Sequence, residues 1–482
     1  MLHFYNTLTR RHEEFVPLQE GKVGIYLCGP TIYAPPHIGN LRTFFFADIL
    51  HRYLEFRGYE VRFVMNLTDV DDKTIRGALK EGVSLAEYTE PFAALLFEDL
   101  AALGFEPADS YPRATRFIPQ MVELVERLQA RGLAYPAPDG SVYYDISAFP
   151  DYGKLSHTDL EQGRRGERVA ADDYEKGDAR DFALWKGAKP EDAQVGAVWD
   201  TPWGPGRPGW HIECSAMSMH ELGETFDIHC GGIDLIFPHH EDEIAQSEGA
   251  TGKPFVRYWL HGEFLQLEGE KMAKSVGNVF TLQELLGRGV KGSSIRYTFL
   301  TARYRSKLNF TFDALSASAE AVSRLFTTWK RLRDHPTVLH ARPEDDPSLH
   351  PAATRALGAF TEAMDDDLNT PVALAALWDL VREVNSRLDE LGAIPITEAE
   401  ARAALDSFAR IDQVLGFLSL AEHECSAAEA DLTVWVDEKI AVRQAARAAR
   451  DFARADEIRQ ELAARNVVLE DTPTGPRWRI GT

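Results

Sequence analysis

The sequence predicts an α/β fold, in which a parallel β-sheet is interrupted by an insertion and followed by an all-α helical bundle and a small C-terminal module. Three observations predict it: an early strand–helix–strand succession, a separate strand signal at residues 141–146, and apolar residues that repeat every three to four positions from about residue 316. The chain has 482 residues, 44% of them hydrophobic, so three or more domains can form substantial cores.

The first β-α-β unit is predicted near the N-terminus. Residues 23–28 form a short apolar run that a Gly-Pro pair ends, residues 41–56 have apolar positions at helical spacing, and residues 61–65 form a second apolar run. The connecting helix should begin near His37. A helix N-terminus has unpaired N–H groups and the positive end of the helix dipole, so an anion is favoured there.

Residues at this helix start are suited to binding phosphate. Gly39 allows a ligand to approach the backbone closely, and the side chains of His37 and Asn40 can donate hydrogen bonds to phosphate oxygens. An ordinary helix start in such a sheet has similar residues, so these positions alone leave both interpretations open.

A charged, glycine-containing loop is predicted around residues 267–275. Lys271 and Lys274 are three positions apart there and can converge on a polyphosphate as point charges. Because a Lys-x-x-Lys turn is common on protein surfaces, the pattern alone favours a solvated turn.

Four scattered residues form a plausible tetrahedral zinc set. Cys28 ends the first predicted strand, at the sheet edge where α/β proteins bind ligands, and Cys214 lies in a distant segment. His239 and Glu243 are four positions apart on a predicted helix, so they share a face. The alternative is that the two cysteines are small buried core residues. The rival ligands are His229, Cys230 and His240.

Taken together and in order, these segments resemble the cysteinyl-tRNA synthetase family of class I aminoacyl-tRNA synthetases. The likeness covers essentially the whole chain, and the order and length of the matching runs make it specific. Besides the histidine and lysine motifs, the runs are residues 4–9, 66–73, 209–217, 226–234, 304–309, 364–371 and 468–473.

The resemblance implies a Rossmann-type parallel-sheet catalytic domain, a connective insertion, a helical bundle and an anticodon-binding module. The implied sheet halves are 1–125 and 201–255, and the other parts are the insertion 126–200, a lysine-loop and stem-contact region 256–315, the bundle 316–424 and the C-terminal module 425–482. Residues 419–432, which span the boundary between the bundle and the C-terminal module, are expected to form a polar linker.

The resemblance also implies a cysteine–tRNA ligase. Such an enzyme activates L-cysteine with ATP to cysteinyl-adenylate and transfers it to the 3′-terminal adenosine of tRNA(Cys). The implied cofactors are one Zn²⁺ per chain, which selects the cysteine thiolate, and Mg²⁺ with ATP. The expected enzyme is a cytoplasmic monomer that does not bind membranes.

Site residues follow from the resemblance position by position. The implied zinc ligands are Cys28, Cys214, His239 and Glu243. The implied catalytic residues are His37, Asn40, Lys271 and Lys274. The implied ATP contacts are Gly29, His37, Gly39, Asn40, Gly231, Gly232, Asp234 and Lys274. The implied cysteine contacts are Thr68, Trp210 and His229.

The chain departs from the family pattern at three positions. Asn40 replaces the second histidine of the family's HIGH motif, and Ala273 replaces the first serine of KMSKS. Pro36 replaces a cysteine often found before HIGH. The side chain of asparagine can donate a hydrogen bond, but unlike histidine it cannot take up a proton and become positively charged. These departures put the rate of cysteine activation in question.

The net charge of −23 argues against non-specific binding to nucleic acid, so any RNA contact should be a local basic patch. One candidate is a basic stripe on a predicted helix, formed by Arg443, Arg447, Arg450 and Arg454. The alternative is a solvated helix face. Trp478 either stacks on an unpaired base or packs in the core of the small module.

Two other functions remain open at this point. A related ligase would pass the cysteinyl group to a small-molecule amine, but such relatives lack the long C-terminal region seen here. A catalytically inactive zinc-containing nucleotide- or RNA-binding module would explain Asn40 and Ala273. Four cysteines without regular spacing favour a reducing cytosol over a disulfide scaffold.

Overall fold

The computed structural model describes residues 1–157, 181–271, 279–339, 349–465, 467–472 and 475–480. These residues form two compact units, Met1–Leu418 and Ser419–Thr482. In the described part of the chain, no helix is both long enough and apolar enough to cross a membrane.

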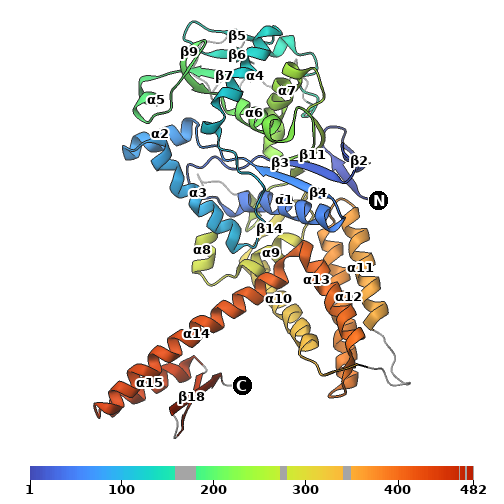
Figure 1. Cartoon of the computed structure of the whole chain (residues 1–482), viewed down its shortest axis with the longest axis vertical. Helices are drawn as coiled ribbons and strands as arrows, with labels where there is room; N and C mark the ends of the chain where they lie inside the picture. The colour runs from blue at the N-terminus through green and yellow to red at the C-terminus, as the bar shows by residue number, and fades with distance from the viewer. Residues whose placement is uncertain (158–180, 272–278, 340–348, 466, 473–474, 481–482) are drawn as a thin grey trace. The chain divides into compact units, whose positions relative to one another are not determined.

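A four-stranded parallel sheet is the centre of the first unit (Figure 1), and its order is β11-β10-β3-β4. The strands are β3 (Lys22–Leu27), β4 (Glu60–Met65), β10 (Phe226–Gly232) and β11 (Val256–Gly262). Helix α1 (Ile38–Phe56) joins β3 to β4, which confirms the predicted β-α-β unit. Helix α6 (Trp210–Leu222) packs on β3 and β4 from the other face of the sheet, beside α7 (Glu241–Thr251).

The sheet order places the ends of β3 and β10 side by side. Leu27 on β3 pairs with Cys230 on β10, and the backbone N–H of Cys28 donates to the carbonyl of Cys230. Segments about 200 residues apart in the chain therefore meet at one carboxyl edge, where α/β sheets bind ligands. The remaining elements of this half are β1 (His3–Asn6), β2 (Arg11–Glu14), α2 (Asp72–Glu81), α3 (Leu85–Ala102) and α4 (Ile118–Ala130).

The insertion folds as a separate five-stranded antiparallel sheet of order β5-β6-β7-β9-β8. Its strands are β5 (Ala134–Pro136), β6 (Val142–Tyr144), β7 (Phe182–Gly187), β8 (Trp199–Thr201) and β9 (Gly204–Pro208), with α5 (Pro190–Gln194) between β7 and β8. The strand β6 lies where the sequence predicts one.

A three-stranded sheet of order β13-β12-β14 follows the parallel sheet. Its strands are β12 (Leu265–Leu267), β13 (Glu270–Lys271) and β14 (Leu308–Phe310), and α8 (Leu282–Gly287) and α9 (Gly292–Leu300) lie between the last two. The backbone of Lys271 is part of β13 and pairs with Gln266, so its predicted place in a loop is wrong. Glu268 and Gly269 adopt positive φ angles of 49° and 85°, which make the turn tight enough for pairing. Lys274 lies outside the described residues.

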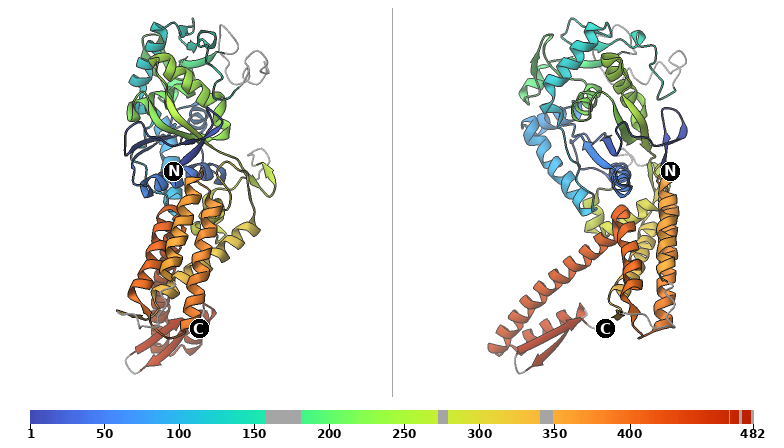
Figure 2. Two further views of the ribbon diagram at one scale, coloured as in Figure 1. Left: turned by 90° about the vertical axis from the view of Figure 1, so that its right-hand side faces the viewer. Right: turned by 45° about the vertical axis from the view of Figure 1, so that its right-hand side comes forward.

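Four helices then form the predicted bundle (Figure 2): α10 (Phe312–Arg333), α11 (Leu349–Asp365), α12 (Thr370–Leu391) and α13 (Glu398–Leu415). Pro371 lies in the first turn of α12, where its missing N–H costs nothing. The short strands β15 (Thr337–Val338) and β16 (Ile396–Thr397) pair between the helices.

The second unit contains most of α14 (Phe417–Ala448), α15 (Phe452–Ala464) and a hairpin of β17 (Val467–Thr472) and β18 (Gly475–Ile480). Residues 419–432 are helical, so the predicted linker is wrong; the many alanines and glutamates of this stretch favour a helix. Trp478 packs against the small apolar core, which agrees with its core interpretation.

The predicted arginine stripe on one helix is also wrong. Helix α14 ends at Ala448, and Arg450 has a positive φ of 61° in the turn before α15. Arg443 is buried, and Arg454 pairs with Glu457. The arginines keep a helical spacing in the sequence, but the turn at Arg450 separates α14 from α15, so they do not share one helix face.

Candidate active site and metal centre

A cleft of about 270 Å³ opens at the carboxyl ends of β3 and β10. It brings together residues that the sequence analysis assigned to three separate roles. The predicted residues that line it are Cys28, Gly29, His37, Asn40, Thr68, Trp210, Cys214, Gly232, Asp234 and His239. The phosphate-type helix start, the metal-type residues and two of the three implied cysteine contacts therefore share one cleft.

The first turn of α1 is closed by a reciprocal cap between His37 and Asn40. The backbone N–H of Asn40 donates to Nδ1 of His37 over 3.1 Å, and the backbone N–H of His37 donates to Oδ1 of Asn40 over 3.2 Å. Because Nδ1 of the imidazole accepts, the neutral ring has its hydrogen on Nε2. Asn40 thus replaces histidine at a position where its amide oxygen stabilises the helix start.

Gly29 is required for close packing just after Cys28. A β-carbon at this position would lie 1.7 Å from the carbonyl oxygen of Asn66. The side chain of Asn66 also accepts from the N–H of Gly29 and donates to Thr68. The glycine therefore lets the β3 and β4 loops approach each other, a role for protein packing that the sequence analysis did not assign.

Cys28, Cys214, His239 and Glu243 have ligand atoms that all lie within 4.8 Å of one another, and all four side chains are buried. The Sγ atoms of Cys28 and Cys214 are 3.6 Å apart, and Oε1 of Glu243 is 3.6 Å from Sγ of Cys28. Nε2 of His239 is 3.1 Å from the same Oε1. The predicted helical face of His239 and Glu243 is therefore present, although α7 itself begins only at Glu241.

These separations fit a tetrahedral zinc ion. Zinc–ligand bonds of about 2.3 Å to sulfur and about 2.0–2.1 Å to nitrogen or oxygen give tetrahedral edges of about 3.8 Å for S–S, 3.5 Å for S–O and 3.3 Å for N–O. The three measured edges are 3.6, 3.6 and 3.1 Å. Each lies about 0.2 Å or less from its ideal value, a tolerance that a real metal site also shows.

The electrostatics of the quartet also favour a cation. A hydrogen bond from Cys28 lowers the pKa of Cys214 to about 6 against the effect of burial. Burial, reinforced by Cys214, raises the pKa of Cys28 well above its ordinary value. The protein alone therefore supports one thiolate here, and a divalent ion would supply the charge needed to deprotonate both thiols.

The rival ligands lie behind the quartet and do not line the cleft. Nε2 of His229 is 3.0 Å from Oε2 of Glu243, and both side chains are fully buried. Nδ1 of His240 is 2.8 Å from Nε2 of His261. A second grouping of Cys28, His229, His240 and Glu243 also meets the distance condition, but only Cys28 of its four members lines the cleft, whereas three members of the first quartet do. Cys230 belongs to neither grouping.

His229, the third implied cysteine contact, does not line the cleft. It supports the far oxygen of Glu243, whereas Thr68 and Trp210 line the cleft as expected. The ring of Trp210 stacks on His239 at 4.2 Å and an interplanar angle of 23°.

A residue without an assigned role orients the histidine of the quartet. Nδ1 of His211 is 2.9 Å from Nδ1 of His239, and its Nε2 is 3.4 Å from Oδ2 of the buried Asp242. The hydroxyl of Tyr152 donates to the other oxygen of Asp242. His211 lies three residues before Cys214 on α6, and this helical spacing was the available signal for its place on the same face.

Four further residues that the resemblance implies as ATP contacts lie at the start of α1 and at the end of β10. Gly39 is in the first turn of α1, and Gly231 is packed so closely that a β-carbon would lie 2.6 Å from the ring of His240. Gly232 and Asp234 line the cleft at the end of β10. The side chain of Lys271 and all of Lys274 lie outside the described part of the structure.

Comparison with protein families finds three consecutive matches. Residues 14–320 match the model for the class I (C) tRNA synthetase catalytic domain, residues 359–419 match the DALR domain, and residues 430–479 match the cysteinyl-tRNA ligase anticodon-binding domain. The first match includes every predicted site residue.

Curated relatives and solved structures agree with these matches. Cysteine–tRNA ligases of Symbiobacterium thermophilum and Solibacter usitatus are each 46% identical to the chain, with 99% of both chains covered. Among solved structures, the methionyl-tRNA synthetase of Mycobacterium tuberculosis with methionyl-adenylate covers 82% of this chain and 90% of its own, with a TM-score of 0.58 at 17% identity. That likeness shows the fold alone. Through its catalytic, DALR and anticodon-binding segments, the chain belongs to the cysteinyl-tRNA synthetase family of class I aminoacyl-tRNA synthetases.

Proposed function

We propose that the chain is a cysteine–tRNA ligase, which activates L-cysteine with ATP and transfers it to the 3′-terminal adenosine of tRNA(Cys). The observation that carries this function is the placement of two thiols and an imidazole on the wall of the cleft that also holds the N-terminus of α1, with the buried carboxylate of Glu243 within ligand distance of all three. A site for a soft sulfur ligand thus adjoins a site for phosphate.

We propose zinc, held by Cys28, Cys214, His239 and Glu243, as the cofactor that recognises the substrate. When bound, zinc lowers the pKa of a thiol and holds the thiolate in preference to a hydroxyl. A purely apolar pocket would distinguish cysteine from serine poorly. Thr68 and Trp210 would line the rest of the cysteine pocket, with the indole ring also fixing the plane of His239.

The activation step joins the cysteine carboxylate to the α-phosphorus of ATP and releases pyrophosphate. Catalysis here is mostly positioning and charge stabilisation. The dipole of α1, with Nε2–H of His37 and the amide nitrogen of Asn40, would hold phosphate oxygens. Lys271 and Lys274 would neutralise the leaving pyrophosphate, and Mg²⁺ would accompany ATP.

Binding of the nucleoside is proposed for the end of β10. Gly232 and Asp234 line the cleft there, next to the region of α1 that would hold the phosphates. The carboxylate of Asp234 can accept hydrogen bonds from ribose hydroxyls or an adenine amino group. Gly29, Gly39 and Gly231 remain proposed ATP neighbours through their backbone.

The transfer step requires the 3′-terminal hydroxyl of tRNA to attack the adenylate carbonyl. Because the chain has a net charge of −23, tRNA recognition must rest on local surfaces, and residues 430–479 match an anticodon-binding domain. We also propose a cytoplasmic monomer, which analytical ultracentrifugation would test. The free thiols of Cys28, Cys214, Cys230 and Cys425 agree with a reducing compartment.

ATP–pyrophosphate exchange with cysteine and with serine tests the function. The variant C214A removes one quartet thiol, and C230A is the matched control because it removes a buried thiol outside the quartet. If a four-ligand zinc site is worth about 10–16 kcal/mol, the loss of one ligand should weaken zinc binding by roughly 2.5–4 kcal/mol, or about 10²- to 10³-fold.

The expected result is exchange driven by cysteine and not by serine, abolished in C214A and retained in C230A. Exchange that accepts serine equally would refute selection by the quartet. Absence of any cysteine-dependent exchange in the zinc-loaded protein would instead support a binding-only protein, the interpretation that Asn40 and Ala273 leave open.

A further inference from the structure

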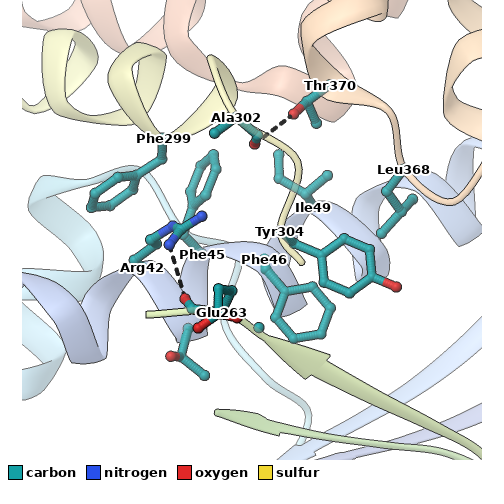
Figure 3. A pocket seen from close by; sticks show the side chains of 12 residues that line it. Arg42, Phe45, Phe46, Ile49, Glu263, Phe299, Ala302, Tyr304, Leu368 and Thr370 are labelled. Carbon is teal, nitrogen blue, oxygen red and sulfur yellow. Dashed lines mark hydrogen bonds between the residues drawn. The ribbon is translucent and has the colours of Figure 1, made fainter. Parts of the chain in front are cut away.

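Arg42, one turn into α1, binds two connecting segments of the chain with a single guanidinium group. These segments, called the two crossovers below, are residues 263–264 and 303–306. Its Nη1 donates to the carbonyl oxygens of Glu263 and Phe264 over 2.8 and 2.7 Å. Its Nη2 donates to the carbonyl oxygens of Arg303 and Ser306 over 3.4 and 2.5 Å. Figure 3 shows the side chain extending from α1 toward Glu263.

The guanidinium has no carboxylate hydrogen-bond partner among these contacts, although it is buried. Only 5% of Arg42 is exposed, and the surrounding cavity of about 20 Å³, roughly the space of one water molecule, is lined by Phe45, Phe46 and Phe299 among others. A buried cation is costly unless its donors are satisfied. Here four backbone carbonyls accept from Nη1 and Nη2, which carry four of the five N–H groups, so the guanidinium and both crossovers hold one another in a single arrangement.

Each crossover leads into a strand of the small sheet. Residues 263–264 join β11 to β12, and residues 303–306 join α9 to β14. Since β12 lies between β13 and β14, the two anchored crossovers determine where β13 lies relative to α1. The strand β13 ends at Lys271, the first of the two lysines proposed to act on pyrophosphate.

The chain is also tied to α1 beyond the undescribed residues 272–278. The N–H of Ile38 donates to the carbonyl of Phe280 over 2.9 Å, and His37 pairs with Thr281 as an isolated antiparallel bridge. The N-terminal part of α1 therefore holds both flanks of the lysine motif, through Arg42 on one side and through His37 and Ile38 on the other.

We propose that Arg42 is a positioning residue for the activation step: it fixes the β12–β13 hairpin, and with it the entry to the lysine motif, relative to the phosphate-binding end of α1. The proposal rests on the proposed function. Arg42 touches no predicted substrate group, because it does not line the 270 Å³ cleft.

The forked shape of arginine is essential to this role. One nitrogen serves each crossover, whereas a lysine has a single nitrogen and can hold only one of the two pairs. R42K therefore keeps the buried charge but releases one crossover. R42M removes the charge and both crossovers while keeping most of the side-chain volume.

Arg52 provides a matched control on the same helix. It is 8% exposed, pairs with Asp48 and donates to the carbonyl oxygens of Gly104 and Gln413. None of these contacts reaches the small sheet. R52K and R52M therefore perturb a second buried arginine of α1, which also pairs with Glu106, and leave the β12–β13 hairpin anchored.

The test measures zinc content, melting temperature, and kcat and KM for cysteine-dependent pyrophosphate exchange in all four variants. Because displacement of a catalytic group by about 1 Å can cost about 100-fold, we expect kcat of R42K and R42M to fall roughly 10- to 100-fold. The KM for cysteine should stay within about twofold, since the zinc quartet is on other elements. The Arg52 variants should keep wild-type kcat.

Equal kcat values for the Arg42 and Arg52 variants after correction for the folded fraction would overturn the proposal, because Arg42 would then act on stability alone. A rise in the KM for cysteine without a fall in kcat would overturn it as well. If R42M does not fold, R42K decides by the same criteria. Failure of the proposed function is distinguishable, since wild type and R52K would then lack cysteine-dependent exchange.

Discussion

Replacing His211 with alanine should weaken zinc binding without removing any ligand. The metal is expected on Nε2 of His239, the atom that faces Glu243 at 3.1 Å, so the hydrogen of this ring must be on Nδ1. That Nδ1–H then donates to Nδ1 of His211 over 2.9 Å. His211 then has its own hydrogen on Nε2, and this nitrogen lies 3.4 Å from Oδ2 of Asp242.

The magnitude follows from the position of His211 in this chain of hydrogen bonds. Loss of a partner that orients a metal-bound histidine typically costs about 10- to 100-fold in metal affinity, or roughly 1.4–2.7 kcal/mol. That is close to the net value of about 1.5–3 kcal/mol for a hydrogen bond involving a charged group. The effect of H211A should therefore be smaller than that of C214A, which removes a first ligand.

Competition with a chromophoric zinc chelator measures the affinity directly. H220A is the matched control, because His220 lies on the same helix but packs its ring on Phe117, away from the quartet. D242N should give a smaller loss than H211A, since Asp242 lies beside His211, one step further from the metal ligands. An H211A affinity within about twofold of wild type would refute the proposed orientation of His239.

Three further predictions concern the pH dependence of stability, the start of α1 and the close packing at Gly29. Burial raises the pKa of Asp99 to about 6, above about 3.9 in the unfolded chain, so its protonated form stabilises the fold at low pH and that contribution is lost as pH rises through 6. D99N should therefore gain in melting temperature relative to wild type between pH 4.5 and 7.5, and a constant difference would contradict this. N40A removes the amide oxygen that accepts from the N–H of His37, so the free energy of unfolding in chemical denaturation should fall by about 1 kcal/mol. The kcat of pyrophosphate exchange should fall as well, because the amide nitrogen proposed to hold phosphate is lost. An unchanged kcat would exclude Asn40 from phosphate binding. G29A should lose bound zinc in metal analysis, because a β-carbon 1.7 Å from a carbonyl oxygen must displace the neighbouring Cys28, and full zinc content would show that the loop can adapt.

Much of the fold was predictable because its signals are local. The periodicity of residues 23–65 defines β3, α1 and β4 almost to the residue, and the proline after Thr370 marks the start of α12. The same reliance on spacing produced the error at Arg450, where a left-handed turn ends a helix whose side-chain pattern continues. Periodicity reports which face a residue would occupy, but not whether the helix persists.

The residue types that form the site could also be predicted from the sequence. Their protonation states and their contacts with one another could not. Cys28 and Cys214 could be assigned to a metal from residue type and family resemblance, but the low pKa of Cys214 depends on a sulfur 3.6 Å away from a distant segment. The support that His229 gives to Glu243 likewise depends on the register of β10. These properties exist only after the sheet has formed.

Arg42 illustrates the same limit most clearly. In the sequence it is one charged residue of an amphipathic helix, five positions after His37, and nothing local distinguishes it from Arg52. Its partners lie 221 to 264 positions away, and all of them are backbone carbonyls, which no side-chain pattern can reveal. Because β13 is attached to α1 through these carbonyls, we propose that the position of β13 relative to the start of α1 is set by a residue that belongs to neither proposed phosphate-binding motif. The comparison of R42K with R52K therefore asks whether the two motifs are sufficient for activation, or whether activation also needs the buried contact of Arg42 that anchors β13 to α1.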